Sequence, residues 1–596
     1  MRSLPSIPLV LALTCAAHAL QERTVLRDVH VVDVETGRVL RDQALVIEGE
    51  RIASMGPVAS VTVPEGATVI EGRGRHVMPG LFDMHVHFRP EDGAEDELLL
   101  FLAGGVTTVQ CMSGSPWHLD VRARVAAGTL LGPRVFTTGP TTAQLRVHTP
   151  EEAERTVREQ KAAGYDGVKM YGDGSNTMPR ETYHRLIATA HELGLRVVGH
   201  APRNLPFSAV IEEEQDSIDH MEEIVYTDEG LGAVVQPYVD LQFGRTQFAD
   251  HPELLGDVPD FRPRLREAVE KLARRVRDAG LHVTPTLMTF RTIQEITGDE
   301  IHGLNRRPEL AYVHPTTRAA WTPERQRFRT GNWSEHLQFL HDYLLRNVEL
   351  QFALVNAFHE AGVPLMTGTD APFDFVVPGF ALHEELAAFV SAGLSPLEAL
   401  RAATIVPAQF LGVDGGTVAP GQRADLVLVD GNPLDDIGAV REIGGTCVRG
   451  RWLSRDDLDA RLAAIATRNE HAQERVDAIA AHLDASRFAD ALAELRKGER
   501  DPHLDAWVEG RINERGYELL RAKHLDEAIA LFRSNTEAFP AAPNTWDSLG
   551  EACLEAKRYE DALENYERAL ALNPANEGAQ RAIDRIVEAL GKAPAR

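Results

Sequence analysis

Two histidines separated by a single residue, His85 and His87, lie at the end of an apolar run that resembles a β-strand. Residues two apart on a strand point to the same side, so both imidazoles can bind one metal ion. The pair alone is weak evidence, because a chain with 23 histidines contains such pairs by chance. Four more groups that can bind a metal or move a proton also end strand-like runs: Lys169, His200, His220 and Asp370. One such residue is usually a capping or hydrogen-bonding group, but six on five strands indicate a metal-dependent active site.

These residues need a scaffold that brings distant strand ends together. Between residues 78 and 411 the chain alternates strand-like and helix-like runs, with clear helical patterns at 151–164 and 179–194. This alternation predicts an α/β fold containing a (β/α)8 TIM barrel, in which active sites lie at the carboxyl ends of the strands. The longest connections, 223–281 and 289–363, leave that same face, where a lid or substrate pocket is expected. The eight predicted strands are Met78–Phe88, Thr107–Met112, Arg134–Gly139, Gly167–Gly172, Arg196–Ala201, Ser217–Glu222, His282–Met288 and Pro364–Ala371.

Short β-like runs punctuated by glycine occur on both sides of the barrel, at 20–77 and 412–455. We expect these two pieces to pair into one composite β-sandwich built from both ends of the barrel.

The last part of the chain, residues 456–596, has the composition of an all-α domain and contains an internal repeat. The repeat is clearest at 511–576 and resembles tetratricopeptide repeats. Such a module predicts an interaction surface for a protein partner or a homo-oligomer, or an element that shapes access to the barrel. The pairs that recur at a spacing of 34 residues are Gly516 and Gly550, Ala528 and Ala562, Phe532 and Tyr566, and Pro540 and Pro574.

The order of the metal-competent residues resembles the amidohydrolase superfamily, in particular its imidazolonepropionase-like and prolidase-like branch. The resemblance covers roughly residues 23–452. It includes the run Ala403-Thr404-Ile405-Val406-Pro407-Ala408 after the eighth strand and the return to β structure at 420–426.

This resemblance implies a binuclear Zn²⁺ site. His85, His87 and Asp370 are expected to bind one ion and His200 and His220 the second, with a carboxylated Lys169 bridging the two. An ammonium group facing two cations in a dry barrel is disfavoured, whereas a carbamate supplies a bidentate anion. The alternative is a Lys169 that points outward beside a single metal ion.

The resemblance leads to a hydrolytic hypothesis. A metal-bound hydroxide attacks a carbonyl carbon, because Zn²⁺ lowers the pKa of bound water to about 7. Asp370 accepts the proton and passes it to the leaving group, so an amide, another C–N bond or a dipeptide is cleaved. One alternative is a mononuclear deaminase or ring-opening hydrolase of cyclic amides. Another is a repeat-based interaction protein with an inactive barrel, against which the complete ligand set argues.

Four residues just beyond predicted strand ends are candidates for contacts with a small-molecule or dipeptide-like substrate, and each also suits a structural role. They are Tyr171, Arg203, Tyr226 and Arg291. Arginine suits a substrate carboxylate.

Charge and the first residues limit partners and location. A formal net charge of −27 without any basic run argues against nucleic acid. Residues 1–19 combine a positive start, a short apolar stretch and Ala17-His18-Ala19, which predicts a signal peptide cleaved after Ala19 and export to the periplasm or medium. No later apolar stretch is long enough to span a membrane. Three cysteines remain after cleavage and are predicted to be buried and unpaired: Cys111, Cys447 and Cys553.

Overall fold

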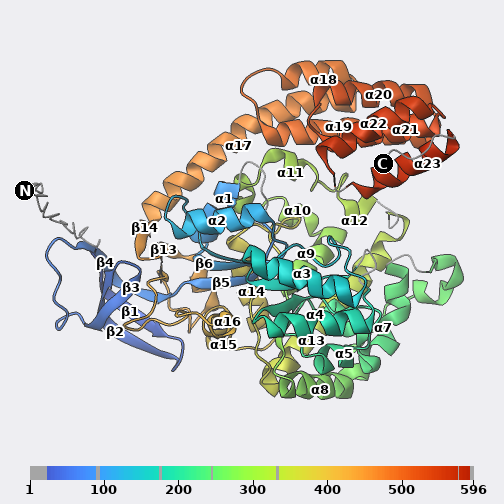
Figure 1. The fold of residues 1–596 in the computed structure, drawn as a ribbon. Helices are drawn as coiled ribbons and strands as arrows, with labels where there is room; N and C mark the ends of the chain where they lie inside the picture. Colours follow the sequence, from blue (N-terminus) through green and yellow to red (C-terminus); the bar gives the residue numbers. More distant parts are fainter. Residues whose placement is uncertain are drawn as a thin grey trace, which may run out of the picture.

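The chain forms a β-sheet unit, a central barrel and a helical module (Figure 1). The structure is a computed structural model, and the predicted signal peptide at 1–19 lies outside the residues that it describes. The described residues are 23–88, 94–172, 177–242, 246–330, 334–574 and 576–590. Within them, no helix is both long and apolar enough to cross a bilayer. Cys111, Cys447 and Cys553 are buried and free, as the sequence predicted.

The two β-rich flanks join into one sheet in the order β14-β13-β12-β4-β1-β2-β3. The junction is the antiparallel pairing of β12 with β4, in which Leu426 lies opposite Pro79. Side chains of these strands, among them Val31, Ile47 and Leu428, form an apolar core of their own. Hydrogen bonds thus connect both flanks in a single seven-stranded sheet. Its strands are β1 (Arg23–Asp33), β2 (Arg38–Glu48), β3 (Arg51–Pro57), β4 (Thr68–Pro79), β12 (Leu426–Val429), β13 (Ile443–Val448) and β14 (Arg451–Ser454).

The barrel follows the predicted strand order with shorter strands. The eighth predicted strand forms no ladder, but it closes the barrel through single bridges from Leu365 to Val283 and from Ala371 to Val86. The seven regular strands are β5 (Leu81–Val86), β6 (Val106–Cys111), β7 (Arg134–Thr137), β8 (Gly167–Met170), β9 (Arg196–Gly199), β10 (Ser217–Asp219) and β11 (His282–Thr284).

Two strand predictions extended too far, to Glu222 and to Met288. Helices α6 (Glu222–Thr227) and α9 (Leu287–Thr297) begin there instead. The physical reason is a turn to positive φ at the strand ends, with 65° at His220, 51° at Thr286 and 58° at Asp370. Residues other than glycine rarely adopt this backbone conformation, and those that do are often found at functional sites.

The helices around the barrel include both of the clear sequence predictions. α3 begins after a capping box at Thr149 and ends at Gly164, whose φ of 90° gives a left-handed cap. α4 begins after Pro179. The helices that cover the barrel strands are α1 (Ala94–Ala103), α2 (Pro116–Ala126), α3 (Pro150–Ala163), α4 (Arg180–Glu192), α5 (Phe207–Glu212), α8 (Arg262–Asp278), α13 (Leu337–Ala361), α14 (Phe380–Ser391), α15 (Pro396–Ala402) and α16 (Ile405–Leu411).

The two long connections add further helices at the same end of the barrel. The connection after β10 contains α6 and α7 (Glu229–Gln242). The connection after β11 contains α9, α10 (Ile301–Leu304), α11 (Pro315–Ala319) and α12 (Arg327–Thr330).

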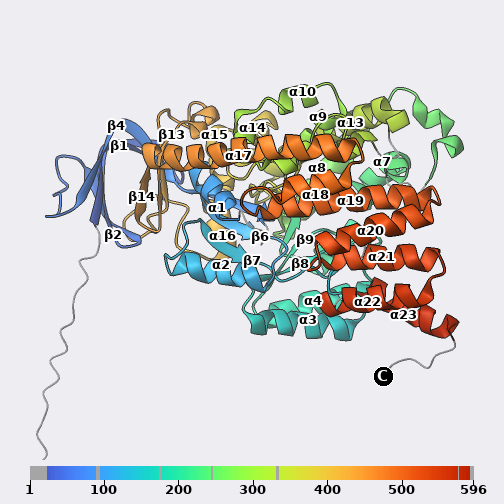
Figure 2. The ribbon, with the colours of Figure 1, turned by 90° about the horizontal axis from the view of Figure 1, so that it is seen from above.

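A 30-residue helix, α17 (Arg455–Asp484), runs from the sheet across the barrel to the helical module (Figures 1 and 2). The 34-residue repeat has a packing explanation. A Cβ atom at Gly516 would lie 2.4 Å from the ring of Phe532, and one at Gly550 would lie 3.1 Å from the ring of Tyr566. Each repeat therefore needs glycine where its aromatic side chain packs. The helices are α18 (Phe488–Leu495), α19 (Pro502–Arg521), α20 (Leu525–Ala538), α21 (Pro543–Glu555), α22 (Tyr559–Leu572) and α23 (Glu577–Ala589).

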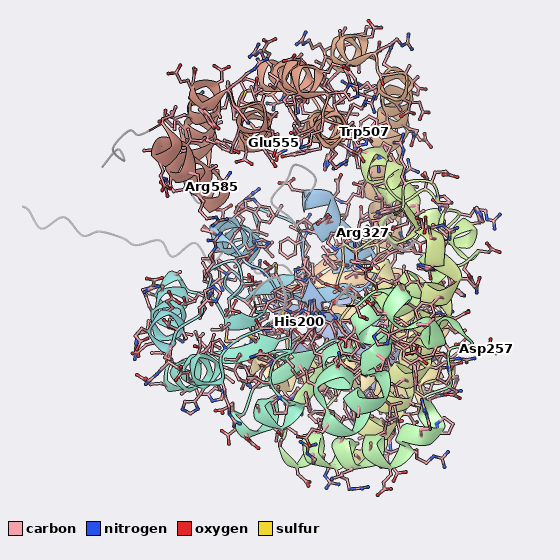
Figure 3. The ribbon with its side chains drawn as sticks, turned by 90° about the vertical axis from the view of Figure 1, so that its right-hand side faces the viewer. His200, Asp257, Arg327, Trp507, Glu555 and Arg585 are labelled. Atoms are coloured by element: carbon pink, nitrogen blue, oxygen red, sulfur yellow. The ribbon has the colours of Figure 1, made fainter. Side chains whose placement is uncertain are left out.

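The helical module contacts the barrel through the connection that follows β11. His314 Nε2 lies 3.3 Å from a carboxylate oxygen of Asp501, and the two residues belong to the barrel and the module respectively. Arg325 likewise donates a 2.9 Å hydrogen bond to Asp484. In Figure 3, Arg327 lies between His200 inside the barrel and Trp507 on the module. The module is thus bound to the segment next to the barrel opening.

Histidine 383 on α14 gives this fold a predictable pH dependence. Its Nε2 donates a 2.8 Å hydrogen bond to the carbonyl oxygen of Gly104, and burial lowers its pKa from 6.5 to about 4. The folded state favours the neutral ring, whereas the unfolded chain binds a proton below pH 6.5. The free energy of unfolding is therefore highest above pH 6.5 and falls by about 3 kcal/mol as the pH decreases towards 4. We expect the melting temperature of His383→Gln to change less with pH between pH 6.5 and 4 than that of the wild type. An unchanged slope in thermal melts would contradict this.

Candidate metal centre

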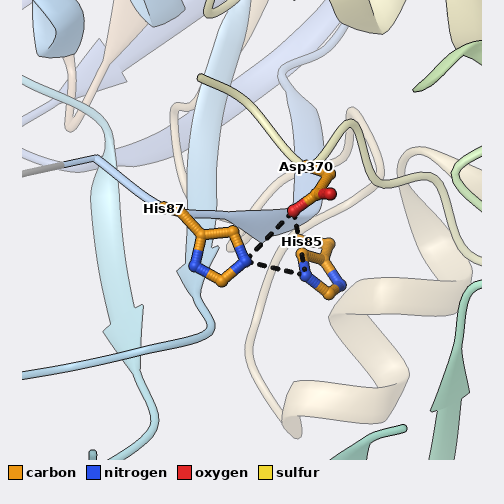
Figure 4. Close-up of side chains that lie close together, drawn as sticks. All are labelled: His85, His87 and Asp370. Carbon is orange, nitrogen blue, oxygen red and sulfur yellow. Dashed lines mark hydrogen bonds and ion pairs between the residues drawn. The ribbon is translucent and has the colours of Figure 1, made fainter. Parts of the chain in front are cut away.

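Three side chains meet at the carboxyl end of the barrel (Figure 4). His85 lies in β5, His87 follows it, and Asp370 lies in the segment that closes the barrel. Nε2 of His85 is 3.1 Å from Nε2 of His87, and Oδ1 of Asp370 lies 3.4 Å and 3.1 Å from these two nitrogens. Three donor atoms that face a common point can bind one metal ion.

The remaining predicted ligands lie around the same opening. The ring centroids of His85 and His220 are 4.5 Å apart, and those of His220 and His200 are 4.8 Å apart. A cavity of about 850 Å³ is lined by His87, Lys169, His200, His220 and Asp370 among others. The structure therefore brings together all six residues that the sequence singled out, from five separate segments of the barrel.

Three of the histidines turn Nδ1 away from this centre and towards a side-chain oxygen. Nδ1 of His220 is 2.7 Å from Oγ1 of Thr286, and that hydroxyl donates its own hydrogen to the carbonyl oxygen of Pro285. Thr286 must therefore accept from His220, which leaves the lone pair on Nε2. Nδ1 of His85 lies 3.3 Å from Asp219 and Nδ1 of His200 lies 3.1 Å from Glu223. This arrangement is typical of metal-binding histidines.

Lys169 points inward from β8 and is 2% exposed. Its Nζ lies 3.2 Å from Oδ2 of Asp219, which is 1% exposed. Although burial disfavours the charged carboxylate, Lys169 and His85 lower the pKa of Asp219 below its usual range. Asp219 was not among the predicted site residues, although it directly precedes His220.

A second buried aspartate, Asp83 in β5, holds the segment that carries Asp370. It accepts hydrogen bonds from the Thr369 amide at 3.0 Å and from the Thr369 hydroxyl at 2.6 Å. Burial raises the pKa of Asp83 to about 7. Asp370 itself is different: burial opposes its ionisation, but the hydrogen bond from His87 and the nearby imidazoles lower its pKa below the usual range. Asp370 is therefore anionic at neutral pH, as a candidate metal ligand should be.

Of the four predicted substrate contacts, Tyr171, Arg203 and Tyr226 line the cavity. Arg291 is not among its lining residues, and its Nε donates a 3.0 Å hydrogen bond to Glu295 one turn along α9. Helix α9 begins at Leu287 and places Thr289 and Phe290, but not Arg291, in the cavity wall, so a substrate contact of Arg291 remains a prediction.

The sequence reasoning missed several residues of the cavity wall. Glu222 and Glu223 begin α6 two residues after His220, and their carboxylates lie close to His200. Burial and the neighbouring Glu223 raise the pKa of Glu222 well above its usual value. Burial opposes ionisation of Glu223, but His200 and Arg203 outweigh it and lower its pKa. Further missed wall residues come from the long connection after β11, from the segment after Asp370 and from loops after β6 and β7: Thr289, Phe290, Ile293, Arg327, Phe328, Phe373, Ser113, Thr141, Ala143 and Gln144.

The place of Lys169 depends on Gly199. A Cβ atom there would lie 2.6 Å from the carbonyl oxygen of Met170 and 2.7 Å from Cδ of Lys169, and φ is 117°. We expect Gly199→Ala to destabilise the protein by about 2 kcal/mol and to reduce its bound metal. Gly194→Ala is the control, because that glycine also has positive φ but has nothing within 4 Å of the added atom. Equal melting temperatures and metal contents for the two variants would contradict this.

The family relationship agrees with this geometry. The amidohydrolase family model matches residues 76–453, so the chain belongs to the amidohydrolase family. Residues 543–576 match the tetratricopeptide repeat, as the sequence predicted.

Individual relatives cover the sheet and the barrel. The dihydroorotase of Pelotomaculum thermopropionicum is 26% identical over 439 residues, which are 71% of this chain and 93% of that protein. A Xaa-Pro dipeptidase structure with bound methionine has a TM-score of 0.52 at 19% identity and covers 73% of this chain and all of that one. The bottromycin amidohydrolase has a TM-score of 0.53 at 23% identity, over 74% of this chain and 90% of that one. Together they establish the TIM-barrel fold of this family.

Proposed function

We propose that the protein is a metal-dependent hydrolase that cleaves a C–N bond of an amide or dipeptide. The observation that carries the proposal is the orientation of the histidines. Three of them direct Nδ1 to Asp219, Glu223 or Thr286, so that their Nε2 atoms remain for metal ions beside Asp370. A complete set of such ligands also argues against an inactive barrel that only carries repeats.

The donor set fits divalent zinc. His85, His87 and Asp370 would hold one ion. His200 and His220 would hold a second, with carboxylated Lys169 as the bridge. Imidazole nitrogen and carboxylate oxygen are ordinary Zn²⁺ ligands, and a catalytic zinc site lowers the pKa of bound water and polarises a carbonyl group.

The chain's own residues then handle substrate and proton. Asp370 takes a proton from the attacking water and delivers it to the leaving nitrogen, so one C–O bond forms as the C–N bond breaks. Tyr171 lies in the cavity wall with 37% of its surface exposed, where its hydroxyl can donate a hydrogen bond to the substrate carbonyl. The aromatic side chains of Phe290, Phe328 and Phe373 supply an apolar wall that excludes water.

A mononuclear hydrolase of cyclic amides is the second candidate. The 3.2 Å pair between Lys169 and Asp219 favours it, because a lysine that serves as the counter-charge of Asp219 is not a metal ligand. The similarity to a protein named dihydroorotase also supports this candidate. Metal content separates the two candidates.

We also propose that residues 1–19 direct export and are removed after Ala19, and that the helical module shapes access to the cavity through its contacts with the connection that follows β11. The support for export is the charged, then apolar, then small-residue order of the sequence. Cell fractionation with determination of the mature N-terminus tests export.

The function is tested on purified protein by metal analysis together with hydrolysis assays. The substrates are N-acyl amino acids, Xaa-Pro dipeptides and dihydroorotate. We expect about two zinc ions per chain and activity that is lost on chelation and restored by zinc. One ion with dihydroorotate cleavage would favour the second candidate. No bound metal and no hydrolysis would refute both.

A further inference from the structure

A carboxylate cluster lies beside the candidate metal centre, at the start of α6. Oε1 of Glu223 is 3.1 Å from Nδ1 of His200 and 3.0 Å from a guanidinium nitrogen of Arg203. Glu222 is the next member, and its carboxylate lies within 4.8 Å of the donor atoms of both Glu223 and His200. Arg203 also lies over the ring of Tyr226, 5.7 Å from its centroid. Glu223 is therefore engaged on two sides, by one positioning contact with His200 and one ion pair.

The Glu222 carboxyl group lies in the cavity wall, and one of its oxygens has no hydrogen-bond partner among the described residues. The side chain lines the cavity, the residue is 8% exposed, and Oε2 accepts no hydrogen bond. A buried polar atom without a partner is costly, so native proteins usually pair such atoms with a ligand, water or ion. Because the Glu222 side chain lines the cavity, a ligand bound there can reach this carboxyl group.

The charges of the cluster define what this ligand carries. Two carboxyl groups lie beside one guanidinium, that of Arg203, so with both carboxyl groups ionised the cluster would take up one further positive charge. A divalent cation between Glu222 and Glu223 would be close to Arg203, which is 3.0 Å from Glu223, and like charges repel. A substrate ammonium has one charge and donates hydrogen bonds, and the aromatic faces of Tyr171 and Tyr226 in the same wall also favour a cation.

We propose that Glu222 is a specificity residue that binds a free amino group of the substrate, so that aminoacyl amides and dipeptides with a free N-terminus are preferred over N-acylated ones. This inference rests on the proposed hydrolase function of the same cavity. It distinguishes substrates with a free amino group from N-acylated substrates, between which the family relationship alone does not choose.

The test compares leucine p-nitroanilide, which has a free amino group, with its N-acetyl derivative. We expect the wild type to show a kcat/KM at least about 10-fold higher for the free amine. Glu222→Gln should lose about 10-fold on the free amine, mainly through KM, and change little on the N-acetyl substrate. An equal loss on both substrates, or a wild-type preference for the N-acetyl compound, would overturn the proposal.

Two further readouts keep the result independent of turnover. Thermal shifts with leucinamide and N-acetyl-leucinamide report binding, and we expect only leucinamide to raise the melting temperature, an effect that Glu222→Gln removes. If neither compound binds, the proposal fails even where hydrolysis of other amides supports the proposed function. The metal content of Glu222→Gln should equal that of the wild type, and loss of an ion would make Glu222 a metal ligand instead.

Discussion

Replacement of Asp370 by asparagine is expected to lower kcat by about 10³-fold while the protein retains its metal ions. Asparagine keeps an oxygen close to the place of Oδ1, which lies 3.1 Å from His87 and 3.4 Å from His85, so metal binding through these residues continues. The amide cannot accept the proton that Asp370 takes from water. The measurement is steady-state kinetics on the best substrate, together with metal analysis of the same preparations.

Two comparisons make this prediction specific. Thermal melts should show that Asp370→Asn remains folded, because the backbone N–H of residue 370 still donates its 2.7 Å hydrogen bond to the carbonyl oxygen of His85. His87→Ala, in contrast, should lose metal as well as activity. If Asp370→Asn kept near wild-type turnover, the role of proton carrier would have to pass to another group.

The six ligand candidates could be predicted because they depend on one rule of the fold. Each lies at or just after the carboxyl end of a barrel strand, and parallel strands in a barrel bring those ends together whatever lies between them in sequence. The exact strand lengths did not matter for this conclusion. His200 and His220 line one cavity with Asp370 although 150 residues separate Asp370 from His220.

Residues that depend on side-chain direction could not be predicted in the same way. Asp219 resembles an ordinary polar residue in a strand, and its importance follows only from the distance to Lys169, two strands away. Glu222 was placed inside a strand, but the positive φ of His220 starts a helix there and turns its carboxylate into the cavity wall. Arg291 likewise lies on helix α9, which the sequence did not place, and outside the residues that line the cavity.

The position of the helical module also lay beyond the sequence. The 34-residue period identified its repeats, because glycine and an aromatic ring must recur together. Nothing in that period indicates which barrel segment the module contacts. The ion pair of Arg325 with Asp484 and the contact of His314 with Asp501 place it on the connection that contributes Arg327 and Phe328 to the cavity.

Replacement of Lys169 by methionine is expected to reduce the zinc content from about two ions to one and to lower kcat/KM by about 100-fold or more, if the lysine carries a bridging carbamate. Methionine fills a similar volume without a ligand atom. Isotope-labelled bicarbonate provides a direct measurement, since a carbamate signal should be present in the wild type and absent from the variant. An unchanged zinc content near one ion would instead support the mononuclear candidate.

Stability must be separated from metal binding in this variant. If Lys169 is not carboxylated, its ammonium group pairs with Asp219, which is 1% exposed, and methionine then leaves a buried carboxylate beside the imidazoles of His85 and His220. Removal of one partner of a buried ion pair costs about 3–5 kcal/mol, which a large fall in melting temperature would report. The double variant Lys169→Met with Asp219→Asn removes that unpaired charge and should recover most of the lost stability. If it recovers stability but not the second zinc ion, Lys169 itself binds the metal; if it recovers both, the lysine acts only as the counter-charge of Asp219.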